Sequence, residues 1–220
     1  MQPFLFNKIR TDMKKATLLL LLYSVQSWAH PHSWVEMNTY IQGNQKEITG
    51  LYMVWEFDPM TTAYMLDGED RSDPLMLKRL ANSISDNMLS HHYFTYFYQG
   101  ELPIKYRKAI DPELILTRGK ATLRFDLPLA KPVSHNRNVL KLLIFDPSYY
   151  VDMSWNSTGA IHLSENIPCT IRLEKPNPTP EQMAYAMTLP IDADPDDALG
   201  QLFTETLYID CNEQEKNSLR

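Results

Sequence analysis

The sequence predicts an α+β fold that is mostly antiparallel β, arranged as a sandwich or a sheet, with one dominant helix and short C-terminal helices. Three observations carry this prediction. Apolar and polar residues alternate in several short stretches, which is the period of half-buried strands. Only residues 73–90 combine helical spacing with a helix-start signal over a long run. Strands and helices do not alternate regularly, so a doubly wound parallel sheet is not expected.

The elements follow from local patterns along the chain. Residues 35–41 and 51–57 alternate and predict a β-hairpin, and a short helix is expected at residues 59–66. Ser72, Asp73 and Pro74 supply an N-cap and a first-turn proline for the long helix. Later strands are expected at residues 93–98, 102–106, 121–127, 139–145, 169–173 and 205–211.

The C-terminal part begins with a proline-rich connection at residues 175–180, which favours an extended spacer. Short helices are expected at 181–187 and from the cap at 194–197 through Phe203. We therefore divide the exported chain into a β-rich main domain, residues 30–174, and a segment of residues 175–220 that packs back on it.

The first 29 residues are typical of a cleaved secretory signal. Basic residues such as Lys8 and Lys15 precede an apolar run at 16–23, and small residues follow at Ser27 and Ala29. The run is shorter than the roughly 20 residues of a membrane-spanning helix. Met13 is an alternative start, since the lysines directly after it open a typical signal. We expect a periplasmic protein that begins at His30 and has no transmembrane segment.

Charge and cysteine content narrow the class further. Removing residues 1–29 takes away four basic residues and one acid, so the formal charge of −6 becomes −9. Such an acidic chain has no electrostatic reason to bind nucleic acid. The two cysteines, Cys169 and Cys211, are expected to form a disulfide in an oxidising compartment, with two buried free thiols as the alternative.

No catalytic motif is found, so we do not expect an enzyme. The nucleophile elbow, the phosphate-binding loop, the dinucleotide fingerprint and HExxH are all missing.

The histidine side chains are the strongest candidates for metal ligands in this sequence. After cleavage, His30 would offer its α-amine and its ring, with His32 nearby. Pro31 has no N–H to lose, which blocks a square-planar amide chelate. The alternative is that both histidines belong to an unstructured terminus.

Other candidate ligands have an ordinary structural interpretation beside the functional one. His91 and His92 follow the long helix, and positively charged side chains at a helix C-terminus interact favourably with the helix dipole. His135 is expected in a solvated loop, and His162 in a strand. Asp58 and Asp146 each precede a proline at a strand end, which is common in turns. Both carboxylates could nevertheless converge at one sheet edge and bind a metal.

An acidic loop at residues 67–73 has the composition of a calcium site but not its pattern. A calcium loop needs glycine at its sixth position and glutamate at its twelfth, and Ser72 and Lys78 stand there instead. We interpret it as a loop and helix cap.

Several stretches together resemble a known family. They are the leading His-Pro-His, "VWEFD" at 54–58, "FTYFYQG" at 94–100, "IFDPSYYVDM" at 144–153, and the C-terminal cysteine. The chain is similar over residues 29–211 to the DUF1007 family of uncharacterised periplasmic proteins. Members tend to accompany membrane permeases of the nickel and cobalt transporter type.

The resemblance implies an accessory role in transition-metal transport, with His30 and His32 matching the family's leading histidines. The first hypothesis is a protein that binds nickel, cobalt or zinc and passes it to or from a membrane permease. The second is a metal-free β-rich adaptor that binds the permease through an aromatic surface. A copper enzyme with a histidine brace is a third, and it would need His92 or His162 as a distant ligand.

Overall fold

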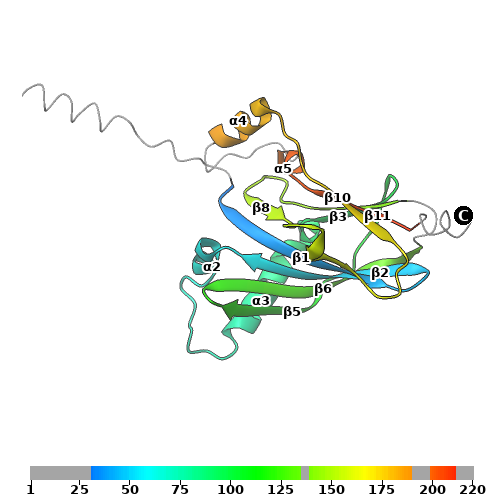
Figure 1. Cartoon of the computed structure of the whole chain (residues 1–220). Coiled ribbons are helices and arrows are strands. Elements are labelled where there is room, and N and C mark those ends of the chain that lie inside the picture. Colours follow the sequence, from blue (N-terminus) through cyan, green and yellow to red (C-terminus); the bar gives the residue numbers. More distant parts are fainter. Residues whose placement is uncertain (1–30, 135–138, 190–198, 212–220) are drawn as a thin grey trace, which may run out of the picture.

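The computed structural model describes residues 31–134, 139–189 and 199–211. The expected signal segment 1–29, His30, His135 and the expected cap at 194–197 lie outside these residues. Two β-sheets stack on each other, with helices at their margins (Figure 1). This arrangement confirms the predicted α+β class.

The larger sheet is built around the N-terminal hairpin. Its strands are, in spatial order, β5 (Ile110–Thr117), β6 (Lys120–Ser134), β2 (Glu47–Phe57), β1 (Ser33–Gly43) and β8 (Val151–Ser154). A short strand, β9 (Ile161–Leu163), also pairs with β1. The β1–β2 pair is antiparallel, as predicted, but β8 and β9 run parallel to β1. Strands β8 and β5 are not predicted from the sequence, and of β9 only the strand position of His162 is.

The smaller sheet joins the middle of the chain to its C-terminal end. Its order is β10 (Thr170–Glu174), β11 (Thr206–Asp210), β7 (Leu140–Ile144), β3 (Thr95–Gln99) and β4 (Leu102–Pro103). The strand predicted at residues 102–106 is therefore only two residues long. Beyond it, Tyr106 makes an isolated bridge to Leu129 of the larger sheet.

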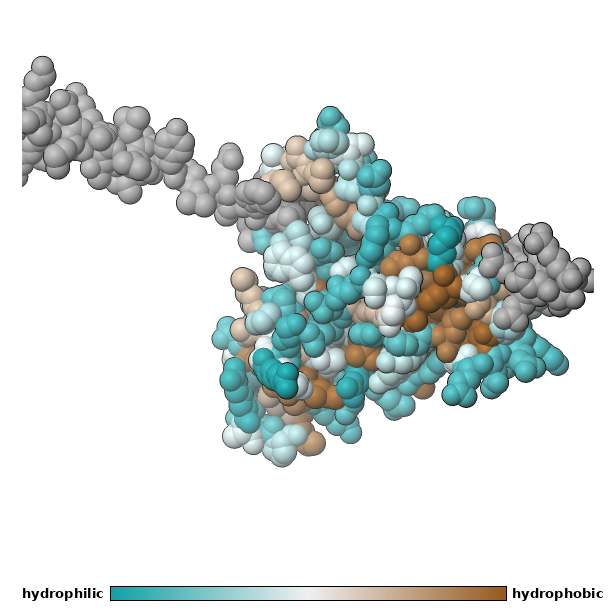
Figure 2. All heavy atoms as spheres, in the orientation of Figure 1, coloured by the Kyte–Doolittle hydropathy of each residue, from teal (hydrophilic) through white to brown (hydrophobic). Residues whose placement is uncertain are grey.

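The core lies between the inward faces of the two sheets. Alternation along β2 buries Met53, Trp55 and Phe57, while β6 contributes Phe125 and β3 contributes Phe97. The Trp55 and Phe125 rings meet edge to face at 5.1 Å, a favourable aromatic geometry. Figure 2 shows an apolar patch at the side of the stack near β2 and β10, on a face that is otherwise mostly hydrophilic.

Four α-helices of short to medium length complete the described part of the fold. They are α2 (Pro59–Met65), α3 (Met76–Leu89), α4 (Pro180–Thr188) and α5 (Leu199–Leu202). The long helix packs against β5 and contributes Ala81 and Met88 to the core. Among the residues described, no helix has the length and apolar character needed to cross a membrane.

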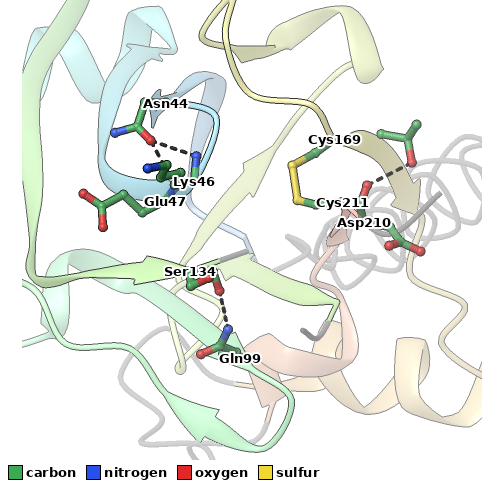
Figure 3. The surroundings of a disulfide bond; sticks show 9 residues. Asn44, Lys46, Glu47, Gln99, Ser134, Cys169, Asp210 and Cys211 are labelled. Carbon is green, nitrogen blue, oxygen red and sulfur yellow. Dashed lines mark hydrogen bonds between the residues drawn. A yellow bond between two sulfur atoms is a disulfide. The ribbon is translucent and has the colours of Figure 1, made fainter. Parts of the chain in front are cut away.

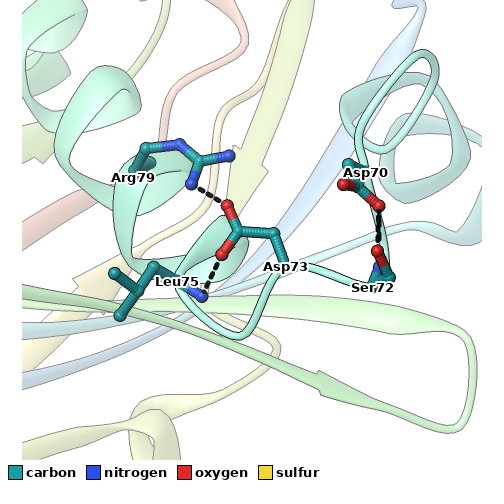
Figure 4. Close-up of polar contacts among 5 residues, drawn as sticks. All are labelled: Asp70, Ser72, Asp73, Leu75 and Arg79. Atoms are coloured by element: carbon teal, nitrogen blue, oxygen red, sulfur yellow. Dashed lines mark hydrogen bonds and ion pairs between the residues drawn. The ribbon is translucent and has the colours of Figure 1, made fainter.

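The long helix starts three residues later than residue 73, the predicted start, because Asp73 forms a turn of its own. Its side chain accepts a hydrogen bond from the Leu75 N–H at 2.8 Å and pairs with Arg79 (Figure 4). Asp70 likewise accepts from the Ser72 hydroxyl at 2.6 Å. The acidic loop therefore uses its carboxylates for turns, as interpreted from the sequence, but the predicted N-cap is wrong: Leu75 occupies that position and makes no side-chain capping bond.

Three consecutive residues after α3 adopt a left-handed backbone. His92, Tyr93 and Phe94 have φ values of 52°, 54° and 53°. For residues with a Cβ this conformation costs about 1–2 kcal/mol each. The turn is held by packing, since the Tyr93 side chain is 2% exposed and its hydroxyl accepts the Ala109 N–H at 2.9 Å. It redirects the chain from α3 into β3.

The predicted disulfide is present and ties β10 to the end of β11 (Figure 3). Cys169 and Cys211 are bonded across a sequence separation of 42 residues. The two strands also pair through antiparallel backbone hydrogen bonds. The bond therefore fastens β11 to β10, the strand beside it in the sheet.

Replacing both cysteines with alanine should lower the free energy of unfolding by about 3–4 kcal/mol, because the open chain regains loop entropy. Denaturant unfolding of the oxidised protein and of the double variant measures this difference. In native protein quenched without reductant, both thiols should resist alkylation until they are reduced. Alkylation before reduction would show that the bond is not formed.

Substitution of His92 by glycine should leave the free energy of unfolding unchanged or raise it. Glycine adopts positive φ without steric cost, which offsets its greater entropy in the unfolded chain. The matched control is His91→Gly, since His91 has φ −104° and stacks on Phe94 at 5.5 Å. The control should lose about 0.5–1 kcal/mol. Equal losses in both variants would contradict strain at position 92.

Candidate functional site

The first candidate site lies at the start of β1, where the expected mature chain begins. His30 is outside the described residues, but His32 is placed directly before the strand. The His32 N–H donates to the Tyr150 carbonyl at 2.9 Å, and the two rings lie 4.8 Å apart. His32 is therefore held against the loop that enters β8.

Asp58 fixes the same strand end from the other side. Its carboxylate accepts from the N–H groups of Trp34, Met60 and Thr61 at 3.0, 2.8 and 3.1 Å, and from the Thr61 hydroxyl. Burial alone would raise the pKa of Asp58, but these hydrogen bonds outweigh it and hold the pKa below its ordinary value. One side chain thus caps α2 and anchors β1.

Asp146 organises the turn that precedes β8. Its buried carboxylate accepts from the Ser148 hydroxyl at 2.9 Å and from the N–H groups of Tyr150 and Val151, both at 3.0 Å. The same turn supplies the Tyr150 carbonyl that binds the N–H groups of His32 and Ser33. Asp146 therefore reaches β1 through the backbone of Tyr150.

The two Asp-Pro turns flank the start of β1, yet both carboxylates are filled by donors of the protein itself. Each oxygen of Asp58 and of Asp146 accepts at least two hydrogen bonds. Metal binding by Asp58 or Asp146 stays a prediction. Within the described ranges, no group of three or more His, Cys, Asp or Glu side chains is arranged to hold a metal ion.

A carboxylate that the sequence analysis missed lies on the same face as His32. Parallel pairing sets Trp34 opposite Asp152, and strand alternation turns His32, Trp34, Tyr150 and Asp152 to one side of the sheet. Burial raises the pKa of Asp152, and the nearby Glu205 carboxylate raises it further. The "YYVDM" stretch contains this residue, but only the pairing of β8 with β1 reveals its neighbours.

Glu205 is almost fully buried beside this face, at 4% exposure. Its carboxylate accepts the Trp155 N–H at 2.6 Å and pairs with Lys175. Lys175 also donates to the Trp155 carbonyl at 2.8 Å. These contacts give Glu205 the partners that a buried charge requires. No local pattern in the sequence identifies it.

At the start of β1 lies a cavity of about 370 Å³ that is lined by residues from both end regions of the described chain. Tyr149 and Phe203 stack in it at 4.2 Å, and burial raises the pKa of Tyr149 to about 12, with a smaller contribution from Asp152. The cavity is lined mainly by apolar side chains, among them Pro31, Trp34, Tyr149, Met183, Met187 and Phe203.

The C-terminal part also touches the Asp146 turn at α5. The Gly200 N–H donates to the Pro147 carbonyl at 2.8 Å. A Cβ at this position would lie 1.9 Å from the Asp146 carbonyl oxygen, so the close approach requires glycine.

His91 and His92 belong to a second region, just beyond α3. Both line a cavity of about 430 Å³ together with Pro147 and Gln201, so this cavity lies behind the Asp146 turn. His162 instead stacks on Tyr40 at 4.3 Å, as expected of a strand histidine. Metal binding by His91 and His92 stays a prediction.

Replacing Asp58 with asparagine should lower the free energy of unfolding by about 1–2 kcal/mol at pH 7, through loss of a charged cap. The pKa of Asp58 is depressed in the folded state, so this stabilisation is present above the unfolded value of about 3.9. It should disappear as the pH falls below about 4.

Denaturant titrations of wild type and variant between pH 7 and pH 3 measure this difference. Asp67→Asn makes the same charge change on the neighbouring exposed loop and should cost little. A stability difference that is independent of pH would contradict the role of the ionised carboxylate.

Comparison with known proteins places the chain in a group without an assigned activity. A family model described as "Protein of unknown function (DUF1007)" matches residues 15–211. An uncharacterised protein of Haemophilus influenzae strain Rd is 34% identical over 209 residues, which cover 90% of this chain and 100% of the relative. The match covers both sheets and the start of β1, and the chain belongs to the DUF1007 family.

Proposed function

We propose that the exported chain is a periplasmic accessory protein of a transition-metal transport system. It binds nickel, cobalt or zinc through His30 and His32 and passes the ion to or from a membrane permease of the nickel and cobalt transporter type. The observation that carries the proposal is the attachment of His32, whose backbone is bonded to Tyr150 directly before β1. A ligand in a fixed position loses little entropy when it binds.

The ligand atoms at this terminus suit a divalent transition-metal ion. After cleavage, the His30 amine and imidazole would offer two nitrogens, and His32 a third. Asp152 pairs with Trp34 on the same face and would add an oxygen. Nitrogen and oxygen ligands of this kind suit zinc, nickel and cobalt.

Export is supported by two separate features. The first 29 residues have the pattern of a cleaved signal. The disulfide between Cys169 and Cys211 is of a kind that persists in oxidising compartments. An ion bound at the start of β1 would lie at one end of the stacked sheets, beside α4 (Figure 1). Such a terminal position would leave it accessible to a partner.

A second candidate function, the metal-free adaptor, is favoured by the outer face of the smaller sheet. Tyr98, Lys141, Tyr208 and Arg172 lie in one row across four strands. Lys141 lies 5.1 Å from the Tyr98 ring, and Arg172 lies 4.3 Å from the Tyr208 ring. Tyrosine and arginine are enriched at protein interfaces, so this face suits a protein partner.

The His30→Ala/His32→Ala variant should lose nickel, cobalt and zinc binding while its melting temperature stays close to that of wild type. Both side chains precede the first strand, and the backbone bonds of His32 do not need its ring. Calorimetry on protein that was exported and cleaved in the periplasm measures the affinity. An added N-terminal methionine would remove the chelating amine.

Proton competition gives the same site a characteristic pH dependence. Wild-type affinity should fall steeply from about pH 8 to about pH 5.5, since the imidazoles and the α-amine must be deprotonated to bind. His91→Ala/His92→Ala is the matched control and should keep wild-type affinity. Equal affinity of wild type and the His30/His32 variant would place the ion elsewhere, and no binding by any of them would favour the adaptor.

A further inference from the structure

Two adjoining cavities lie where the chain passes from α3 into β3. One has a volume of about 530 Å³ and the other about 430 Å³, and both are lined by His92, Tyr96 and Tyr98. The first also borders residues 103–108, which cross from the smaller sheet to the larger one. Each volume falls within the range of small-molecule sites in proteins, about 300–1,000 Å³.

The charges around these cavities are of one sign. Among the described residues that line them, none is an aspartate or glutamate, whereas Lys105, Arg107, Lys108 and Lys141 are present. Lys108 pairs with Asp86 at 2.7 Å, but Lys105 forms no ion pair within the described part of the chain. A positive rim on a chain of net charge −6 favours a negatively charged ligand.

The walls are mainly aromatic. Tyr93 and Phe97 are 2% and 1% exposed and close the inner side of the larger cavity. In the second cavity, Tyr96 stacks on Phe145 at 4.6 Å. Flat rings of this kind favour a ligand with a flat apolar body, because stacked and edge-on contacts add to simple burial.

Two costly features of the fold meet at the same place. The left-handed turn formed by His92, Tyr93 and Phe94 supplies part of the wall, and strained backbone of this kind clusters at ligand sites. The buried Tyr106 hydroxyl has no hydrogen-bond partner within the described ranges. Burial, with a smaller contribution from Tyr98, raises the pKa of Tyr106 well above its ordinary value, so the hydroxyl stays a neutral donor.

We propose that these cavities bind a small organic anion with a flat apolar body, of the class of aromatic carboxylates. The rings hold the body, Lys105 and Arg107 attract the carboxylate, and the Tyr106 hydroxyl donates to the bound molecule once it displaces the side chains that now cover it. This site does not involve His30 or His32 and is independent of the metal proposal.

Calorimetry of the mature, chelator-treated protein with three probes tests the ligand class. The aromatic anion 2-naphthoate should bind saturably with one molecule per chain. Its neutral analogue 2-naphthalenemethanol should bind about tenfold more weakly, since it lacks the charge-assisted contact. Acetate, which has the charge without the ring, should show no binding. Absence of saturable naphthoate binding, or equal affinity for the neutral analogue, would overturn the proposal.

Variants locate the site. Lys105→Gln/Arg107→Gln should weaken naphthoate binding about tenfold. The matched control Lys46→Gln/Arg118→Gln, which makes the same charge change in turns of the larger sheet, should bind naphthoate as wild type does.

Tyr106→Phe should weaken naphthoate binding without lowering the melting temperature, because the lost hydroxyl has no partner in the described chain. Equal effects of the two charge variants would contradict the assignment, as would a destabilised Tyr106→Phe with wild-type affinity. The His30→Ala/His32→Ala variant should bind naphthoate normally.

Discussion

The start of β1 is fixed by carboxylates on both sides, and much of the fold depends on this arrangement. Asp58 bonds the Trp34 N–H and caps α2, while Asp146 shapes the turn whose Tyr150 carbonyl binds His32 and Ser33. Strand β1 is the one on which β2, β8 and β9 all pair. An error in its starting position would shift three registers at once, and a one-residue slip turns every side chain to the opposite face.

The same arrangement brings the two ends of the described chain together. Helix α5 approaches the Asp146 turn so closely that only glycine fits at position 200. Pro31 and Trp34 share a cavity with Met183, Met187 and Phe203 from the C-terminal part. The start of β1 is therefore supported by elements more than a hundred residues away in sequence.

The proposed metal site and the proposed anion site differ in how much backbone strain and how many unpaired polar groups surround them. At the start of β1, each carboxylate of the two turns has its donors, so the anchor itself carries little strain. Around His92, three left-handed residues and a buried hydroxyl without a described partner are retained together. Features that cost stability persist when the surrounding packing enforces them, and a ligand is one reason for keeping them.

The sequence by itself determined the features that depend on residues close together in the chain, and on the cysteine count. The alternation at residues 35–41 and 51–57 predicts the β1–β2 hairpin, helical spacing predicts α3, and an even cysteine count predicts the disulfide. The Asp-Pro pairs identify Asp58 and Asp146 as turn residues. Asp146 bonds the N–H groups of Tyr150 and Val151 within its own turn, whereas the bond from the Trp34 N–H to Asp58 joins residues 24 positions apart and is contained in no local pattern.

Tertiary structure alone decided the rest. Strands β8 and β9 have four and three residues, too few for a periodic signal, and they exist as strands because β1 offers them a parallel edge. Strand β5 buries only Leu114 and contains Pro112, so its alternation is weak. Asp152 came to lie on the same face as His32 only through the pairing of β8 with β1, across more than a hundred residues. Local propensity carries no information about such pairing, because its free energy comes from contacts that form when the sheets assemble.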